Sequence, residues 1–241
     1  PKPFVVVLAA SAALLEALIP PSNAAILFSA LTNVPVSQTF AAGVVPGFIL
    51  LLFMIGIVIV KCRDIPGTAK ASATERWQAG KNALPALITP GIILGGIYAG
   101  LLTPSESAAI AGLWALFMGF AIYRELTFSG LLSCLRETAA ITAVIFAIIA
   151  MATFLSVVLT YSQLPQKIIQ YFTEIGVGIY FFWAALAIIC LVLGTFIEIV
   201  PVFYLTVPIF AAIIISLNQN LLHLYVVFVA FAGIGMITPP V

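Results

Sequence analysis

Residues 41–60 read AAGVVPGFILLLFMIGIVIV, a stretch of twenty residues without a charged side chain. The hydrocarbon core of a bilayer is about 30 Å thick, and a helix of about 20 apolar residues crosses it. This stretch therefore predicts a transmembrane helix. The flanking sequence agrees, because 63% of the 241 residues are hydrophobic and only 7% are charged, against roughly 25% in a soluble domain.

Charged side chains are also unevenly distributed. Seven of the 17 lie between residues 61 and 81, so the remainder of the chain cannot solvate a globular surface. The net charge of +1 gives no basic face for nucleic acid. We therefore expect an all-α membrane protein, a multi-span bundle of about eight apolar segments at the usual span length. Residues 1–241 should form a single transmembrane domain.

Segment 61–83 carries five Lys or Arg residues against two acids. Basic loops lie on the cytoplasmic side of membranes, so we expect this loop to be cytoplasmic, either as a helix at the interface or disordered. Further spans are expected at 84–102 and 107–123. Between them Thr103 precedes Glu106 by three residues, which is the pattern of a capping box at a helix start.

A short motif recurs near the two ends of the chain. Residues 17–23 read ALIPPSN and residues 235–241 read GMITPPV, and each Pro-Pro pair prevents the helix from continuing regularly. Paired interruptions in two halves of a membrane protein indicate a binding site in transporters. The alternative is that each Pro-Pro pair only ends a helix at the membrane surface.

Two acids lie close to such interruptions. Glu16 precedes Pro20 by one helical turn, and we expect it to pair with a cation or to cap a water-filled pocket. Glu198 lies between Gly194 and Pro201, which suggests the loop of a re-entrant hairpin. Acids inside membranes are usually functional, but a solvated loop carboxylate is an equal interpretation of Glu198.

Enzymatic chemistry is not expected. The three cysteines are isolated and His223 is the only histidine, so no metal spacing is present. Ser22 or Ser105 would need a His or Lys partner to act as a nucleophile, and no phosphate-binding GxxxxGK[ST] loop exists. A transporter is favoured, and the alternative is a structural or channel-type membrane subunit that does not transport.

Five motifs together resemble the large membrane subunit of tripartite ATP-independent periplasmic (TRAP) transporters. In chain order they are IPPS (19–22), FAAGVVPG (40–47), GGIYAGLLTPSESAA (95–109), LGTF (193–196) and GMITPPV (235–241). The resemblance covers essentially the whole chain and implies a fragment that lacks the first part of the family sequence and its extreme C-terminus. Two residues depart from the family pattern: Glu16 stands where Gly is usual, and Asn23 where an apolar residue is usual.

The resemblance implies an inverted-repeat, elevator-type permease of the bacterial inner membrane, built with broken helices and re-entrant hairpins, with the loop 61–83 between its repeats. It implies sodium-coupled import of an organic acid such as a C4-dicarboxylate or sialic acid. Implied partners are a periplasmic binding protein, a small membrane subunit and the lipid bilayer. No cofactor is implied apart from sodium as the coupling ion.

The resemblance also assigns residues to the binding of cation and substrate. Sodium is implied at Thr195, Gly235 and Thr238 in particular. The full set expected at the site is Pro20, Pro21, Ser22, Asn23, Gly194, Thr195, Gly233, Gly235, Thr238 and Pro239.

Overall fold

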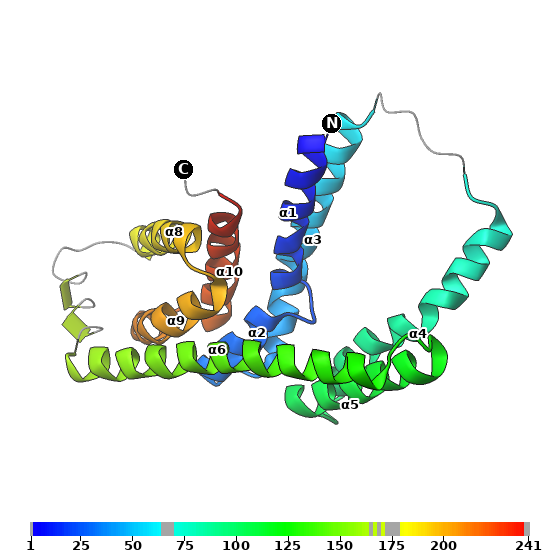
Figure 1. The fold of residues 1–241 in the computed structure, drawn as a ribbon. Helices are drawn as coiled ribbons and strands as arrows, with labels where there is room; N and C mark the ends of the chain where they lie inside the picture. Colours follow the sequence, from blue (N-terminus) through cyan, green and yellow to red (C-terminus); the bar gives the residue numbers. More distant parts are fainter. Residues whose placement is uncertain (1, 64–69, 164–165, 168–169, 172–178, 239–241) are drawn as a thin grey trace. The chain divides into compact units, whose positions relative to one another are not determined.

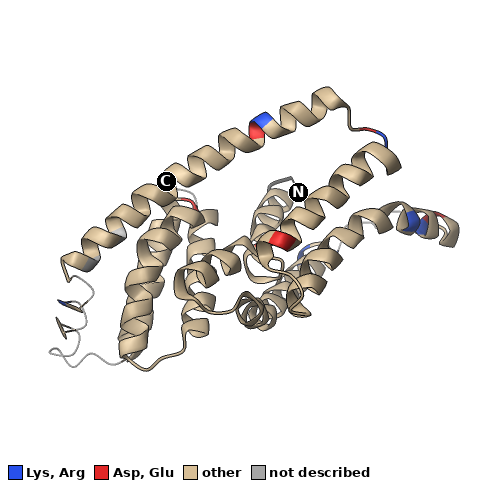
Figure 2. Cartoon of the chain, turned by 90° about the horizontal axis from the view of Figure 1, so that it is seen from below, with Lys and Arg blue, Asp and Glu red and all other residues tan. Residues whose placement is uncertain are grey.

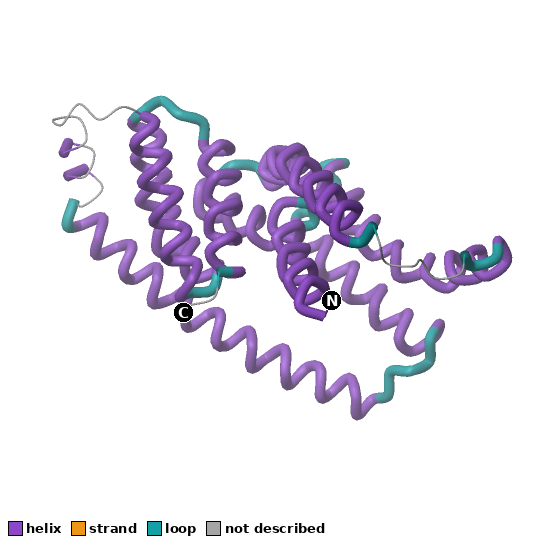
Figure 3. Tube along the Cα trace, turned by 90° about the horizontal axis from the view of Figure 1, so that it is seen from above, coloured by secondary structure: helices purple, strands orange, loops and turns teal. Residues whose placement is uncertain are grey.

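The computed structural model describes residues 2–63, 70–163, 166–167, 170–171 and 179–238. The secondary structure of this part is helical without strands (Figure 3), which confirms the expected all-α class. Figure 1 labels most of the elements. They are α1(Lys2–Leu18), α2(Asn23–Thr32), α3(Val36–Lys61), α4(Ala73–Tyr98), α5(Pro104–Phe117), the π-helical turn η1(Met118–Ile122), α6(Phe128–Tyr161), α8(Ile179–Phe196), α9(Ile199–Ser216) and α10(Leu221–Ile237).

Six stretches of the described residues are long and apolar enough to cross a membrane, against the eight apolar segments that we expected. They are Phe4–Thr32, Val36–Lys61, Pro104–Ile122, Phe128–Leu159, Ile179–Phe196 and Ile199–Ser216, and α10 is a shorter apolar helix. Figure 2 shows the corresponding ribbons almost free of Lys, Arg, Asp and Glu. The chain is therefore a multi-span helical membrane protein.

The expected span 84–102 is not one of these six stretches. It belongs to α4, which begins at Ala73, so the helix includes charged residues of the loop that precedes it. The cause lies at Ser72, whose hydroxyl accepts a hydrogen bond from the Glu75 amide at 3.2 Å while the Glu75 carboxylate accepts one from the Ser72 amide at 2.7 Å. This capping box starts the helix inside the polar segment.

The orientation of the 61–83 loop remains a prediction, and cysteine labelling can test it. Because basic residues outnumber acids there, the positive-inside rule places the loop in the cytoplasm. A cysteine at Ser72 should resist membrane-impermeant thiol reagents added to intact spheroplasts and react after permeabilisation. Rapid labelling from outside the intact cells would contradict this orientation.

The capping hydrogen bonds at the start of α4 should depend on pH, because they require the ionised Glu75 carboxylate. Its hydrogen bonds with the backbone and then the side chain of Ser72 lower the pKa of Glu75 from its ordinary value of 4.5. A lowered folded-state pKa means that the cap stabilises the helix above the unfolded-state pKa and is lost as pH falls through the folded-state pKa. In a carbon-detected NMR titration we expect a Glu75 midpoint below 4.5, and Ser72→Ala should move it back. An unchanged midpoint in Ser72→Ala would contradict this.

The start of α5 follows the same pattern, as the sequence predicts. Thr103 is the N-cap, its hydroxyl accepts from the Glu106 amide at 3.3 Å, and the Glu106 carboxylate accepts from the Thr103 amide at 2.7 Å. Pro104 occupies the first turn, where its missing N–H costs nothing. The predicted capping box is confirmed.

Glu106 should therefore contribute to helix stability and leave transport intact. Because Gln also satisfies a capping box, Glu106→Gln should lower the melting temperature slightly, and Glu106→Ala should lower it further. Uptake per folded molecule should persist in both variants. A complete loss of uptake in a normally folded Glu106→Gln protein would instead assign Glu106 to coupling or to substrate binding.

The described helices divide into two compact units. One comprises Pro1–Met54 with Ala143–Val241, and the other comprises Ile55–Thr142. In the second unit α4 packs on α5, where the Trp114 indole donates to the Pro85 carbonyl at 2.9 Å. In the first unit α10 packs against α1, α2, α8 and α9.

Large aromatic side chains from helices far apart in sequence form the core of the first unit. Phe203 of α9 and Phe228 of α10 meet edge-on with ring centroids 4.5 Å apart, and both are fully buried. His223 stacks on Trp183 at 4.3 Å. This core surrounds α10 and fixes its position beside the two helix interruptions of the unit.

Candidate functional site

The first interruption separates α1, which ends at Leu18, from α2, which begins at Asn23. Ser22 is the N-cap of α2 and is fully buried. Its hydroxyl accepts from the Ala25 amide at 3.2 Å and donates to the Ala17 carbonyl at 2.7 Å. Ser22 thus satisfies a free N–H of the new helix and a freed carbonyl of the old one.

A second donor from the other end of the chain reaches the same carbonyl. The Tyr225 hydroxyl of α10 donates to the Ala17 carbonyl at 3.0 Å, across 208 residues of sequence. Tyr225 is fully buried, and its ring lies 5.4 Å from that of Phe28. The sequence analysis missed Tyr225, since one more aromatic residue in an apolar helix carries no signal.

The second interruption lies between α8 and α9, with only Ile197 and Glu198 separating the two helices. Glu198 is the exposed N-cap of α9, and its side chain makes no capping hydrogen bond. The Thr195 hydroxyl donates to the Val192 carbonyl at 2.7 Å. Glu198 therefore lies in a short loop between two helices, as expected, and whether this hairpin is re-entrant stays a prediction. The amide groups that open α9 receive no bond from its N-cap side chain.

Three predicted glycines lie at close contacts between helices, and two of them, Gly194 and Gly235, meet backbone atoms. A Cβ on Gly235 of α10 would lie 2.5 Å from the Leu191 carbonyl oxygen and 2.9 Å from the Gly194 Cα, and one on Gly194 would overlap the Ala232 carbonyl. A Cβ on Gly233 would overlap the Leu14 side chain of α1. Small residues permit such close approach between membrane helices, so these glycines set the distances of α10 from α8 and α1.

The end of α10 carries the last predicted residues. Thr238 is its C-cap, and its exposed hydroxyl donates to the Ile234 carbonyl at 2.9 Å. The Thr238 hydroxyl therefore uses its proton in this hydrogen bond. Pro239 lies outside the described residues.

The first unit contains a cavity of about 480 Å³, lined by residues between 10 and 24 and by residues between 199 and 237. Asn23 opens α2, Ile199 opens α9 and Gly233 lies in α10, and all three line its wall. The volume falls in the range of small-molecule sites, roughly 300–1,000 Å³. The cavity therefore lies where the first helix break and the start of α9 come together.

Predicted and unpredicted residues share this lining. Asn23 and Gly233 were expected at the site, and Glu16 was expected at a water-filled pocket or a cation. The other predicted residues are not among those that line the cavity: Pro20, Pro21, Ser22, Gly194, Thr195, Gly235 and Thr238. Four residues of α1 that the sequence did not predict also line the cavity. They recur at helical spacing, a pattern that could have identified this face of the helix: Ala10, Ala13, Leu14 and Ala17.

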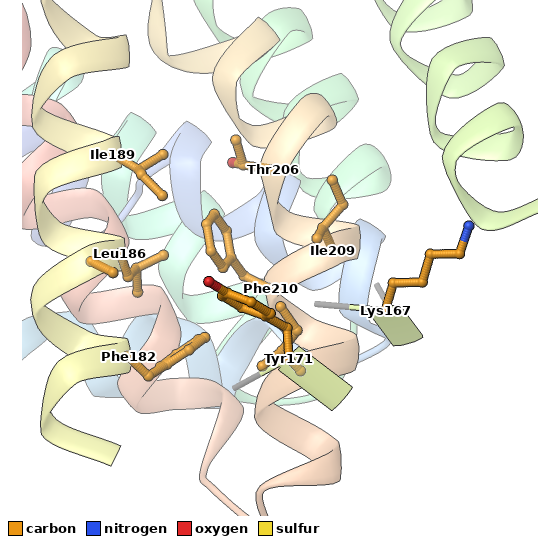
Figure 4. A pocket seen from close by; sticks show the side chains of 10 residues that line it. Lys167, Tyr171, Phe182, Leu186, Ile189, Thr206, Ile209 and Phe210 are labelled. Atoms are coloured by element: carbon orange, nitrogen blue, oxygen red, sulfur yellow. The ribbon is translucent and has the colours of Figure 1, made fainter. Parts of the chain in front are cut away.

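A larger cavity, of about 560 Å³, lies elsewhere in the same unit (Figure 4). Its wall is mostly apolar, and Figure 4 shows the rings of Phe182, Phe210 and Tyr171 close together beside it. None of the predicted site residues lines it. Its size alone therefore does not make it the transport site.

Two helix interruptions, the break before α2 and the turn between α8 and α9, meet at the cavity of about 480 Å³. The second Pro-Pro pair lies outside the described residues. Helices broken at membrane depth persist only where the broken backbone is buried in protein or lines a cavity, and this arrangement is typical of secondary transporters. A family model described as "Tripartite ATP-independent periplasmic transporter, DctM component" matches residues 1–241. The chain belongs to this family, whose members are permeases and not enzymes, and it is a multi-pass protein of the bacterial inner membrane.

Several relatives match most of the chain. It is 36% identical over 243 residues to the C4-dicarboxylate TRAP transporter large permease protein DctM of Pseudomonas aeruginosa, covering 100% of this chain and 57% of that protein. It is 32% identical to the sialic acid TRAP transporter large permease protein SiaM of Vibrio cholerae, covering 97% and 55%. It is also 32% identical to the ectoine TRAP transporter large permease protein TeaC of Halomonas elongata, covering 92% and 53%. The chain thus spans about half the length of these relatives.

Proposed function

We propose that this chain belongs to the permease subunit of a secondary active, sodium-coupled TRAP transporter that imports an organic acid. The observation that carries the proposal is the cavity at which Asn23 of the first break, Ile199 of the second and Gly233 of α10 meet. Such a meeting point of discontinuous helices is where transporters bind substrate and coupling ion.

The cavity offers a place for a carboxylate. Helix α2 begins at its wall behind the neutral N-cap Ser22, and the N–H groups and the dipole of a helix N-terminus favour an anion. Helix α9 also begins there, but its N-cap is the Glu198 carboxylate. The relatives are named for C4-dicarboxylates, sialic acid and ectoine. We propose a small organic acid as the substrate, with its carboxylate at the start of α2.

Sodium would bind at the helix interruptions. Thr195 and Thr238 each place a hydroxyl oxygen beside a helix end, and Gly235 leaves backbone close to Gly194. Neutral hydroxyl and carbonyl oxygens suit a hard cation. In the proposed elevator, a periplasmic binding protein delivers the substrate and a small membrane subunit, separate or fused, completes the transporter.

Uptake into proteoliposomes tests this function. The permease, its small subunit and the cognate binding protein are reconstituted, and accumulation of a panel of labelled organic acids is followed with and without a sodium gradient. We expect concentrative uptake of one acid that requires both sodium and the binding protein. Passive equilibration without sodium dependence would instead indicate a channel-type subunit.

A further inference from the structure

The 480 Å³ cavity contains one ionisable side chain, the carboxylate of Glu16 in α1. Asn23 supplies the only other polar side chain of its wall, and the remaining lining residues are apolar. Among the described residues, no Lys or Arg lines the cavity. Within the described part of the chain, the Glu16 carboxylate forms neither an ion pair nor a hydrogen bond. Among the described residues, the Glu16 carboxylate is therefore unpaired and can interact with a ligand in the cavity.

The position of Glu16 gives the cavity two electrostatically different regions. Glu16 precedes the break of α1, whereas Asn23 and Ile199 are the first residues of α2 and α9. The start of α2, whose N-cap Ser22 is neutral, favours a negative group. The start of α9 already carries the Glu198 carboxylate, and the Glu16 carboxylate favours a positive group. A substrate with negative charges at both ends would place one of them in a small, mostly apolar cavity together with Glu16. The Glu16 side chain is exposed, and the juxtaposition of like charges there is unfavourable.

From this arrangement we infer that the substrate is zwitterionic: a small organic acid that also carries an ammonium, substituted amine or amidinium group. Its carboxylate lies at the start of α2, and its cationic group pairs with Glu16. Asn23 can donate to the carboxylate through its amide. This inference rests on the proposed function and narrows its substrate class. Glu16 is thereby a specificity-determining residue.

Two ligands of equal chain length test the inference. Glutarate and 4-aminobutyrate share one carboxylate and three methylenes, and differ only in a carboxylate or an ammonium group at the other end. Equilibrium binding of each is measured to the complete permease complex in nanodiscs, without the binding protein, because that protein has a selectivity of its own. We expect 4-aminobutyrate to bind on the order of tenfold more tightly or better, since like-charge juxtaposition rejects the dianion.

Two variants of Glu16 and one control variant test whether Glu16 causes the preference for 4-aminobutyrate over glutarate. Glu16→Gln should abolish the preference, and Glu16→Lys should reverse it in favour of glutarate. Glu137→Gln is the control, because it removes an exposed acid from α6 outside the cavity lining. Equal binding, preference for glutarate, binding of neither ligand, or an unchanged preference in Glu16→Gln would overturn the inference. Failure of the proposed function is separate, and would appear as the absence of sodium-dependent uptake of every acid.

Discussion

Replacing Gly194 with alanine should destabilise the packing of α8 against α10. The added Cβ would overlap the Ala232 carbonyl and approach the Gly235 Cα to 3.2 Å. These are backbone atoms of a buried helix, so the helices themselves must separate. Forced insertion of one methyl group into a close-packed interface costs about 1–3 kcal/mol. We expect a clear fall in melting temperature of the purified protein and a loss of monodisperse material in size-exclusion chromatography.

Gly112→Ala is a matched control for this experiment. Gly112 lies inside α5, and a Cβ there has nothing within 4 Å. Since alanine is favoured over glycine in a helix by about 0.5–1 kcal/mol, this variant should be neutral or slightly more stable. Gly194→Ala and Gly235→Ala disturb the same contact, so the double variant should cost less than the sum of the two. Equal stability of Gly194→Ala and Gly112→Ala would contradict the close-approach role.

Replacing Thr238 with alanine should weaken sodium dependence. The variant loses a hydroxyl oxygen at the end of α10 that we propose as a cation ligand. Removing one contact to a charged group costs about 1.5–3 kcal/mol, so the sodium concentration for half-maximal uptake should rise about tenfold or more. Thr238→Ser keeps the oxygen and should have a milder effect. The sodium dependence of uptake is measured at matched expression.

Ser22 offers a comparison at the first break. If a paired sodium site forms there, Ser22→Ala should also raise the sodium requirement. Because Ser22 caps α2 and bonds the Ala17 carbonyl, this variant should lose stability as well. Thr238→Ala should not lose stability to the same extent, since its hydroxyl is exposed. An unchanged sodium curve for Thr238→Ala would show that the second Pro-Pro motif is only a helix stop.

Local sequence patterns were sufficient to predict much of this fold. Continuous apolar runs predicted the spans at 41–60 and 107–123, and Thr103 with Glu106 gave a helix start at the correct residue. The predicted start of the span at residue 84 was wrong, because it was placed from hydropathy alone, and α4 begins at Ala73. The capping residues Ser72 and Glu75 lie in the polar segment and extend the helix through it.

The site was only partly predictable, since its geometry depends on contacts between distant helices. The Pro-Pro motifs and Gly194 were recognised from sequence, but their partners were not. Tyr225 reaches Ala17 across 208 residues, and Ile199 and Val200 reach the cavity through the turn at Glu198. No local pattern encodes such pairings. Glu16 stood out in the sequence as an acid beside a break, and its cavity became visible only in three dimensions.

The bond from Tyr225 to Ala17 also has a consequence for biosynthesis. Chains are made at about 5–20 residues per second, so a partner 208 residues downstream arrives about 10–40 s after Ala17. During that interval the Tyr225 hydroxyl is not yet available, and of the two side-chain donors only Ser22 can bond the Ala17 carbonyl. The first break therefore reaches its final form after translation of α10. Until then, the first break lacks one of its two side-chain hydrogen bonds to the Ala17 carbonyl.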